Sequence, residues 1–141
     1  MTPLEMTTAV LDHAIANWNT ADAALTFDGE RFDAPEGEPW IRLTIRDLPT
    51  ASVTLGARSN RLAQRRATLI AQVFHPLAVS DGAGNALALA IAFRDLFEPA
   101  DITASAGVVH ITGGATVRRI GVDGAWYQVN VDVPLTYHET I

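Results

Sequence analysis

Hydrophobic and polar residues alternate along several segments of the chain, a pattern typical of half-buried β-strands. Residues 40–46 show it clearly, because isoleucine and leucine hold the odd positions 41, 43 and 45 while arginine and threonine hold positions 42, 44 and 46. One face of this strand should pack on a core and the other should face solvent. Related patterns predict further strands at residues 24–27, 51–55, 66–75, 108–112, 115–122 and 126–133.

Two segments instead show the helical period. The first helix is predicted at residues 3–18, with Thr2 as its N-cap and Pro3 in its first turn. Its apolar residues recur at helical spacing and are expected to form the buried stripe: Leu4, Leu11, Ile15 and Trp18. The second helix is predicted at residues 83–97, with its buried face formed by Ala86, Leu89, Ala90, Phe93 and Phe97.

The dipeptide Asp123-Gly124 is the strongest hairpin signal in the chain. Both central residues of a type I′ turn need positive φ, which Asp-Gly tolerates well. We therefore expect residues 123 and 124 to form a two-residue turn between adjacent antiparallel strands.

The order of these elements is helix, strands, helix, strands, which favours the α+β class. We expect a single, mostly antiparallel or mixed β-sheet with both helices packed on one face, and a long β-hairpin arm between residues 47 and 66. The length of 141 residues is typical of one domain, so residues 1–141 are interpreted as a single unit.

Composition limits the possible functions. The chain has no cysteine, which excludes disulfides and cysteine-based metal sites. It has no apolar run long enough to span a bilayer and no signal-like N-terminus, so we expect a soluble protein made in the cytoplasm, with no membrane partner. The net charge is −6 and every basic residue is arginine; an acidic chain is a poor candidate for sequence-independent DNA binding.

No motif in the sequence requires catalysis. Residues 82–87 resemble a dinucleotide fingerprint, but leucine stands at the third glycine position. The histidines His13, His75, His110 and His138 lie on four segments without metal-ligand spacing, although two of them could converge in space with Asp132 or Glu139. We therefore predict no catalytic, cofactor-binding or metal site, and a protein that is not an enzyme.

Four arginines in nine residues, Arg58, Arg61, Arg65 and Arg66, mark the predicted arm. Two interpretations stay open: a solvated hairpin tip that protects a sheet edge, or an arm that contacts another subunit or partner. Acidic partners are available in the loop before the strand at residue 40, namely Glu30, Asp33, Glu36 and Glu38. Arg118 and Arg119 could extend the same surface or point to opposite faces of their strand.

The C-terminal third resembles the closing hairpin of tail terminator-like proteins of long-tailed (siphovirus-type) phages and prophages. The resemblance rests on Val-Arg-Arg-Ile-Gly at 117–121 and on Gly-Ala-Trp-Tyr-Gln-Val-Asn-Val-Asp-Val-Pro at 124–134. Upstream, Pro-Trp-Ile-Arg-Leu-Thr-Ile at 39–45, Gln-Val-Phe-His-Pro at 72–76 and an alanine-rich helix agree in order.

The resemblance implies a virion structural protein at the head-proximal end of the tail. It implies a homohexameric ring that caps the tail tube, ends its polymerisation and joins it to a head-completion or connector protein, while DNA passes through without sequence-specific binding. Two alternatives stay open: another head–tail adaptor or tube protein, or a small-molecule-binding α+β enzyme whose site is assembled from scattered residues.

Overall fold

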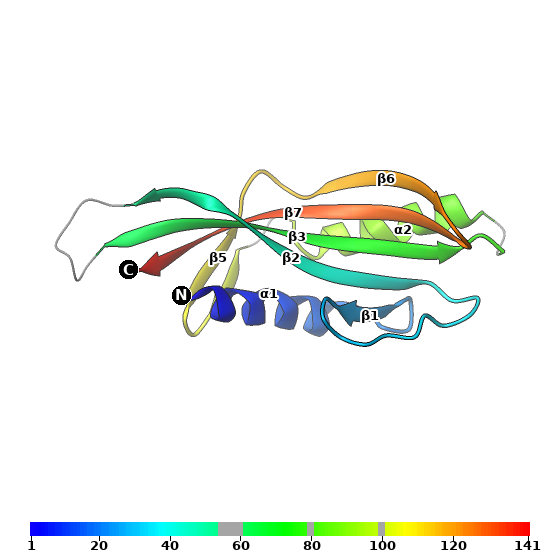
Figure 1. The fold of residues 1–141 in the computed structure, drawn as a ribbon, viewed down its shortest axis with the longest axis horizontal. Helices are drawn as coiled ribbons and strands as arrows, with labels where there is room; N and C mark the ends of the chain where they lie inside the picture. Colours follow the sequence, from blue (N-terminus) through cyan, green and yellow to red (C-terminus); the bar gives the residue numbers. More distant parts are fainter. Residues whose placement is uncertain (54–60, 79–80, 99–100) are drawn as a thin grey trace.

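The computed structural model describes residues 1–53, 61–78, 81–98 and 101–141. Two helices and seven strands make up the described chain (Figure 1). Their bounds are α1 Pro3–Asn17, β1 Ala24–Phe27, β2 Trp40–Val53, β3 Leu62–Pro76, α2 Gly82–Asp95, β4 Ile102–Ala104, β5 Gly107–Ile111, β6 Thr116–Asp123 and β7 Trp126–Thr140.

One mixed sheet organises the fold, in the order β1-β2-β3-β7-β5-β4, with β6 also paired to β7. Only β1 and β2 run parallel among the described pairs; the others are antiparallel. One edge of β7 pairs with β3 along its whole length, while its other edge is shared by β6 and β5. The α+β class with a single sheet is therefore confirmed.

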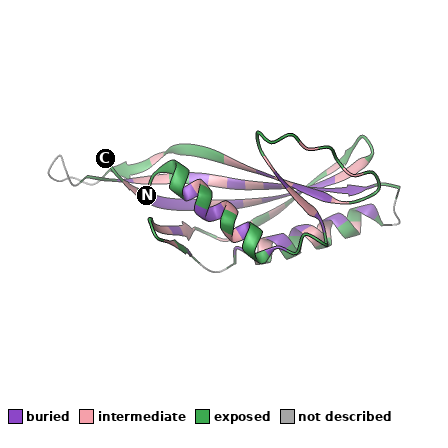
Figure 2. Ribbon diagram, turned by 90° about the horizontal axis from the view of Figure 1, so that it is seen from below, coloured by how far each residue is buried: buried purple, intermediate pink, exposed green. Residues whose placement is uncertain are grey.

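Both helices pack on one face of this sheet, as predicted (Figure 2). Residues of odd number in β3 and β7 point to this face, so valines and leucines such as Leu69, Val73 and Val131 are fully buried. The helices contribute Met6, Val10, Ala86 and Phe93 to the same core. The ring of Trp18, at the end of α1, packs 5.6 Å from that of Phe93, which joins the two helices.

The first helix begins as predicted but buries a different stripe. Thr2 and Glu5 form a reciprocal capping box. The buried residues are Met6, Ala9, Val10 and Ala14, followed by Trp18. The prediction was wrong for Leu4 and Ile15, whereas Leu11 is half-buried and packs against the core. The row at 6, 10, 14 and 18 has equally regular helical spacing, and Ala14 within it and Ala9 beside it let the helix approach the sheet closely. Leu4 is 75% exposed and Ile15 is 53% exposed.

The hairpin of β2 and β3 is longer than the sequence indicated. Residues 40–46 and 51–55 were predicted as separate segments, but β2 continues to Val53 through an irregularity between Leu48 and Ser52. β3 starts at Leu62 rather than at residue 66. The end of β7 lies beside it, because Leu62 pairs with Thr140. The arm, defined here as residues 47–66, is thus backed by a third strand over its described part.

The turn between β6 and β7 is shifted by one residue from its prediction. Asp123 pairs with Trp126, so the two central residues are Gly124 and Ala125. Gly124 has φ +59°, whereas the φ of Ala125 is not positive. A positive φ at the first central position alone is the pattern of a type II′ turn with glycine first, so the predicted type I′ turn at 123–124 was wrong.

The remaining elements differ from prediction mainly at their ends. α2 begins at Gly82 and ends at Asp95, although Phe97 beyond it is fully buried, as expected. β7 continues past residue 133 to Thr140, and the three-residue strand β4 was not predicted. Among the described residues, neither helix has the length and apolar character needed to cross a membrane.

Candidate subunit interface

The four arginines proposed as an interface have different environments. Arg58 lies outside the described residues. Arg61 directly precedes β3, and Arg65 and Arg66 lie within it, on opposite faces of the strand because successive side chains alternate. Arg61 and Arg66 are exposed, whereas Arg65 is half-buried. The arginines are therefore not equally available to a partner.

Arg65 is occupied within its own chain. Its Nε and Nη2 atoms lie 3.0 Å and 2.9 Å from Oε1 of Glu139 on β7, and its Nη1 donates to the hydroxyl of Thr50 on β2. One guanidinium thus links three strands at the base of the arm. This geometry gives Arg65 a structural role whatever the arm contacts.

The other two described arginines of the arm, Arg61 and Arg66, make fewer contacts within the chain than Arg65. Arg66 is exposed and donates from Nε to the carbonyl oxygen of Pro49 at 3.2 Å. The Arg61 side chain makes no ion pair with any residue that the structure describes. Its backbone oxygen accepts from the amide of Ile141 and so holds it at the end of the three-stranded part.

Exposed apolar residues accompany these arginines. Leu48 is 41% exposed, Val53 48%, Leu62 40% and Ile141 47%. A solvated hairpin tip gains nothing from exposed aliphatic side chains, whose burial against a partner would be favourable. The described part of the arm is therefore both cationic and apolar. Sequence reasoning singled out the arginines but missed the apolar residues beside them.

The acidic loop, residues 30–39, runs from the end of β1 toward the end of the molecule opposite the arm (Figure 1). Its carboxylates are all exposed: Glu30, Asp33, Glu36 and Glu38. Phe32 anchors the loop by packing on Trp40, with ring centroids 5.2 Å apart. Because of this separation, the arm and the acidic loop can meet only between two copies of the chain.

A third surface surrounds the outward side of α1. Leu4 and Ile15 are exposed along it, and Leu11 between them in sequence is half-buried and also packs against the core; these three residues are called the outer row here. Between α1 and β4–β5 run two adjoining grooves of about 360 and 290 Å³, which share Ala9, Asp12 and Ala104 in their walls. On the other flank, Leu11 borders a hollow that also contains Asp28 and Asp47. The surface is apolar along its crest and acidic on both sides.

Arg118 and Arg119 do not extend the arm. Arg118 pairs in register with Asn130 and forms a bidentate contact with Asp132, at 2.7 and 3.3 Å, on the helix-free face. This hydrogen bond raises the pKa of Arg118 above its usual value. Arg119 points the other way, toward α2. The two arginines thus lie on opposite faces, one of the two alternatives that the sequence left open.

Two of the four histidines do converge, but with a different acid from those considered. The rings of His110 and His138 are 6.3 Å apart, and Nδ1 of His110 lies 3.1 Å from the Asp101 carboxylate. His13 contacts the carbonyl oxygen of Leu96 at 2.8 Å. Within the ranges that the structure describes, no three His, Asp or Glu side chains are arranged to hold a metal ion.

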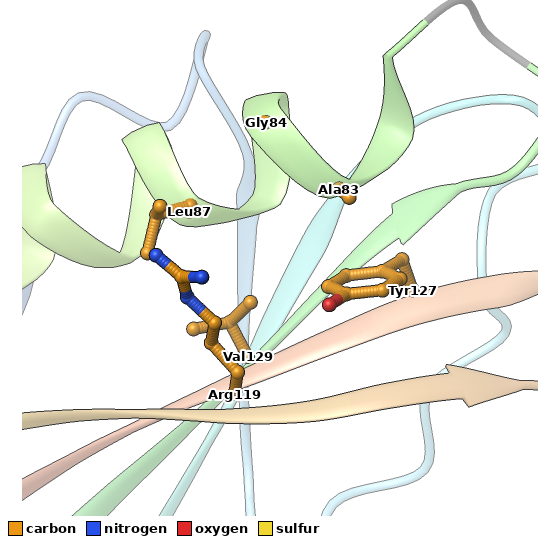
Figure 3. Close-up of a pocket in the computed structure, with 6 residues that line it drawn as sticks. All are labelled: Ala83, Gly84, Leu87, Arg119, Tyr127 and Val129. Carbon is orange, nitrogen blue, oxygen red and sulfur yellow. The ribbon is translucent and has the colours of Figure 1, made fainter.

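The residues that resemble a dinucleotide fingerprint serve the entry into α2. Asp81 caps the helix with φ +56°, and its carboxylate accepts from the amide of Gly84 at 3.3 Å. A Cβ at residue 82 would lie 2.9 Å from the carbonyl oxygen of Pro76, so glycine permits close packing there. The adjacent hollow of about 190 Å³ is lined by Ala83, Gly84, Leu87, Arg119, Tyr127 and Val129 (Figure 3). Among these described lining residues, Arg119 alone carries a charge.

Comparison with known proteins identifies relatives of the whole chain. The family model described as Phage tail terminator protein matches residues 6–135. No curated protein matches the sequence. Among solved structures, one shares the fold with a TM-score of 0.67, at 16% sequence identity, over 94% of this chain and 90% of that one.

Proposed function

This chain belongs to the phage tail terminator family, and from that membership we propose that it caps the tail tube as a six-membered ring, ends tube polymerisation and forms the joint to the head connector. The family match itself assigns to this chain a structural role in the phage tail. The single observation that carries the proposal is the extent of that match, residues 6–135, which spans every element from α1 to most of β7.

The distribution of charge supports a ring. A closed ring needs a heterologous interface, in which one patch of a subunit meets a different patch on its neighbour. The arm is cationic, whereas the acidic loop and the flanks of α1 are anionic, and these surfaces lie on different parts of the subunit (Figure 1). Oppositely charged, separate patches on one chain favour head-to-tail contacts over self-paired ones.

The proposed partners are a second copy of this chain, the tail tube protein and a head-completion or connector protein. DNA would pass through the ring without sequence-specific binding. The net charge of −6 supports free passage, because a basic lining would hold the phosphate backbone. The protein would thus be made in the host cytoplasm and reside in the virion, at the head-proximal end of the tail.

The test combines purified protein with tube protein. We expect electron microscopy to show rings, and tubes that stop growing once capped. Replacing Arg58 and Arg61 together by glutamate should leave the circular dichroism spectrum unchanged but reduce ring formation or capping. A charge-matched control replaces Arg46 and Arg119, which are exposed elsewhere, by glutamate. If the protein stayed monomeric even with assembled tubes present, the ring would be contradicted. If the arm variant formed normal rings, the arm would be an ordinary solvated hairpin.

A further inference from the structure

We propose that the outer row of α1, with the grooves beside it, is the surface that receives the arm of a neighbouring copy of this chain. This inference rests on the ring proposed above and specifies which surface meets the arm. It starts from the exposure of two large aliphatic residues of α1 that the sequence pattern predicted to be buried. Leu4 is 75% exposed and Ile15 is 53% exposed, while Leu11 is half-buried.

The size and shape of this surface fit a β-hairpin. Residues 4, 11 and 15 lie on one side of the helix by their spacing, with the exposed Leu4 and Ile15 toward its two ends and the half-buried Leu11 between them. The two grooves of about 360 and 290 Å³ follow the same helix on its β4–β5 side. Small side chains, Ala9, Ala104 and Ala106, line them, which leaves room for aliphatic side chains to enter.

Charge complementarity selects the arm as the occupant. Glu5 and Asp12 line the grooves, and Asp28 lines the hollow on the opposite flank, where Asp47, the first residue of the chain's own arm, also lies. None of these three sites has an arginine in its described lining, and α1 itself contains none. Asp12 makes no ion pair with a described residue.

The arm carries the opposite set. Arg61 and Arg66 are exposed beside Val53 and Leu62, which are 48% and 40% exposed. Aliphatic side chains from the arm would cover the outer row while the guanidinium groups meet the carboxylates on its flanks. Rim charges of this kind mainly set orientation and specificity, and the apolar contact supplies most of the affinity.

The contact must come from another subunit. β2 and β3 run without interruption from the core of the sheet into the arm, and β7 pairs with β3 as far as Leu62. The arm therefore extends past the N-terminus of α1 and away from the outer row (Figure 1). A chain cannot bend its own arm back without breaking these pairs, whereas a neighbour in a ring can place its arm there.

Site-specific crosslinking tests the proposal directly, because the chain has no cysteine of its own. Arg61→Cys is combined with Leu4→Cys or with Ile15→Cys, and a short bismaleimide is added, since it tolerates separations that a disulfide does not. We expect a ladder of linked subunits that ends at the ring size. An equal mixture of the Arg61→Cys and Ile15→Cys single variants should give dimers only.

Two control pairs separate this surface from others. Arg61→Cys with Ile91→Cys probes an exposed residue on α2, and Arg61→Cys with Glu36→Cys probes the acidic loop. The inference about α1 would be overturned if Arg61→Cys formed links only to Glu36→Cys, or if Ile15→Cys formed links only to tube protein. In both cases the proposed ring itself would stand. Absence of rings from the unsubstituted protein would instead defeat the proposed function itself.

A second variant measures the apolar contribution. Leu4→Ser with Ile15→Ser should raise the concentration needed for half-assembly by about tenfold or more, because two aliphatic side chains no longer become buried. The matched control, Ile91→Ser with Val122→Ser, removes exposed aliphatic groups on α2 and β6 and should assemble normally. Equal assembly of both double variants would overturn the proposal.

Discussion

Replacement of Gly124 by valine isolates the energetic cost of one backbone angle. Gly124 has φ +59°, and a Cβ built there meets nothing within 4 Å. The substitution therefore creates no clash with a neighbour, and its cost comes from forcing an L-residue into positive φ. That cost is about 1–2 kcal/mol for an ordinary side chain and up to about 3 kcal/mol for a β-branched one.

The neighbouring position supplies the matched control. Ala125 is the other central residue of the turn, is exposed and does not have positive φ. Ala125→Val should change the free energy of unfolding by less than about 0.5 kcal/mol. Gly124→Ala and Gly124→Asn should fall between this control and Gly124→Val, because neither is β-branched and asparagine tolerates positive φ.

Urea unfolding followed by circular dichroism measures these differences, with an unchanged m-value showing that only stability is altered. For a chain of this length each kcal/mol lowers the Tm by roughly 4 °C, so Gly124→Val should melt roughly 4–12 °C lower. If Gly124→Val and Ala125→Val unfold with the same free energy, the turn does not have the geometry described here.

Three further predictions concern the core and the base of the arm. Arg65→Glu should lower the free energy of unfolding by about 1–3 kcal/mol, because it places a carboxylate beside Glu139; adding Glu139→Arg should restore part of the loss, as measured by urea unfolding. Phe93→Ala should cost about 3–5 kcal/mol through the cavity it leaves, and Phe93→Leu clearly less, by the same assay. Burial and the charges of Asp47 and Glu139 raise the pKa of Tyr137, so the folded state keeps this proton when the unfolded state releases it. Stability from this group is complete below the ordinary tyrosine pKa and falls as the pH rises above it; unfolding across alkaline pH should show a shallower decline for Tyr137→Phe.

Proline explains why the sequence predicted strands that were too short. Pro49 lacks a backbone N–H, so the segment around it was assigned to a connection between two strands. In the structure it falls at the irregular pairing between Leu48 and Ser52, where a missing donor costs little. Pro134 similarly lies between Asp132, the last residue paired with β6, and Leu135, the first in sequence of β7 paired with β5. The sequence shows that each proline lacks a backbone N–H, but it does not show that the pairing on one side of the strand is interrupted at that residue.

The first helix shows a different limit of sequence reasoning. Its start follows from local chemistry, and Thr2 as N-cap and Pro3 in the first turn were predicted correctly. Its buried face was not, because two apolar rows are available and the periodicity alone does not choose between them. The choice depends on how closely Ala9 and Ala14 let the helix approach the sheet, which is a tertiary property. Only half of the candidate interface was therefore recognised in the sequence. The arginines of the arm were identified, whereas the outer row was assigned to the core.

The position of β7 in the chain has a consequence for how the protein is made. β7 pairs with β3, β5 and β6, all of which precede it, and its valines complete the core under both helices. The hairpin of β2 and β3 can form during synthesis, but the central pairings of the sheet must wait until β7 has been synthesised. These pairings join residues far apart in sequence and are formed slowly. The arm and the outer row are thus held in their final relation only after β7 has joined the sheet, which would keep chains that lack β7 out of the assembly.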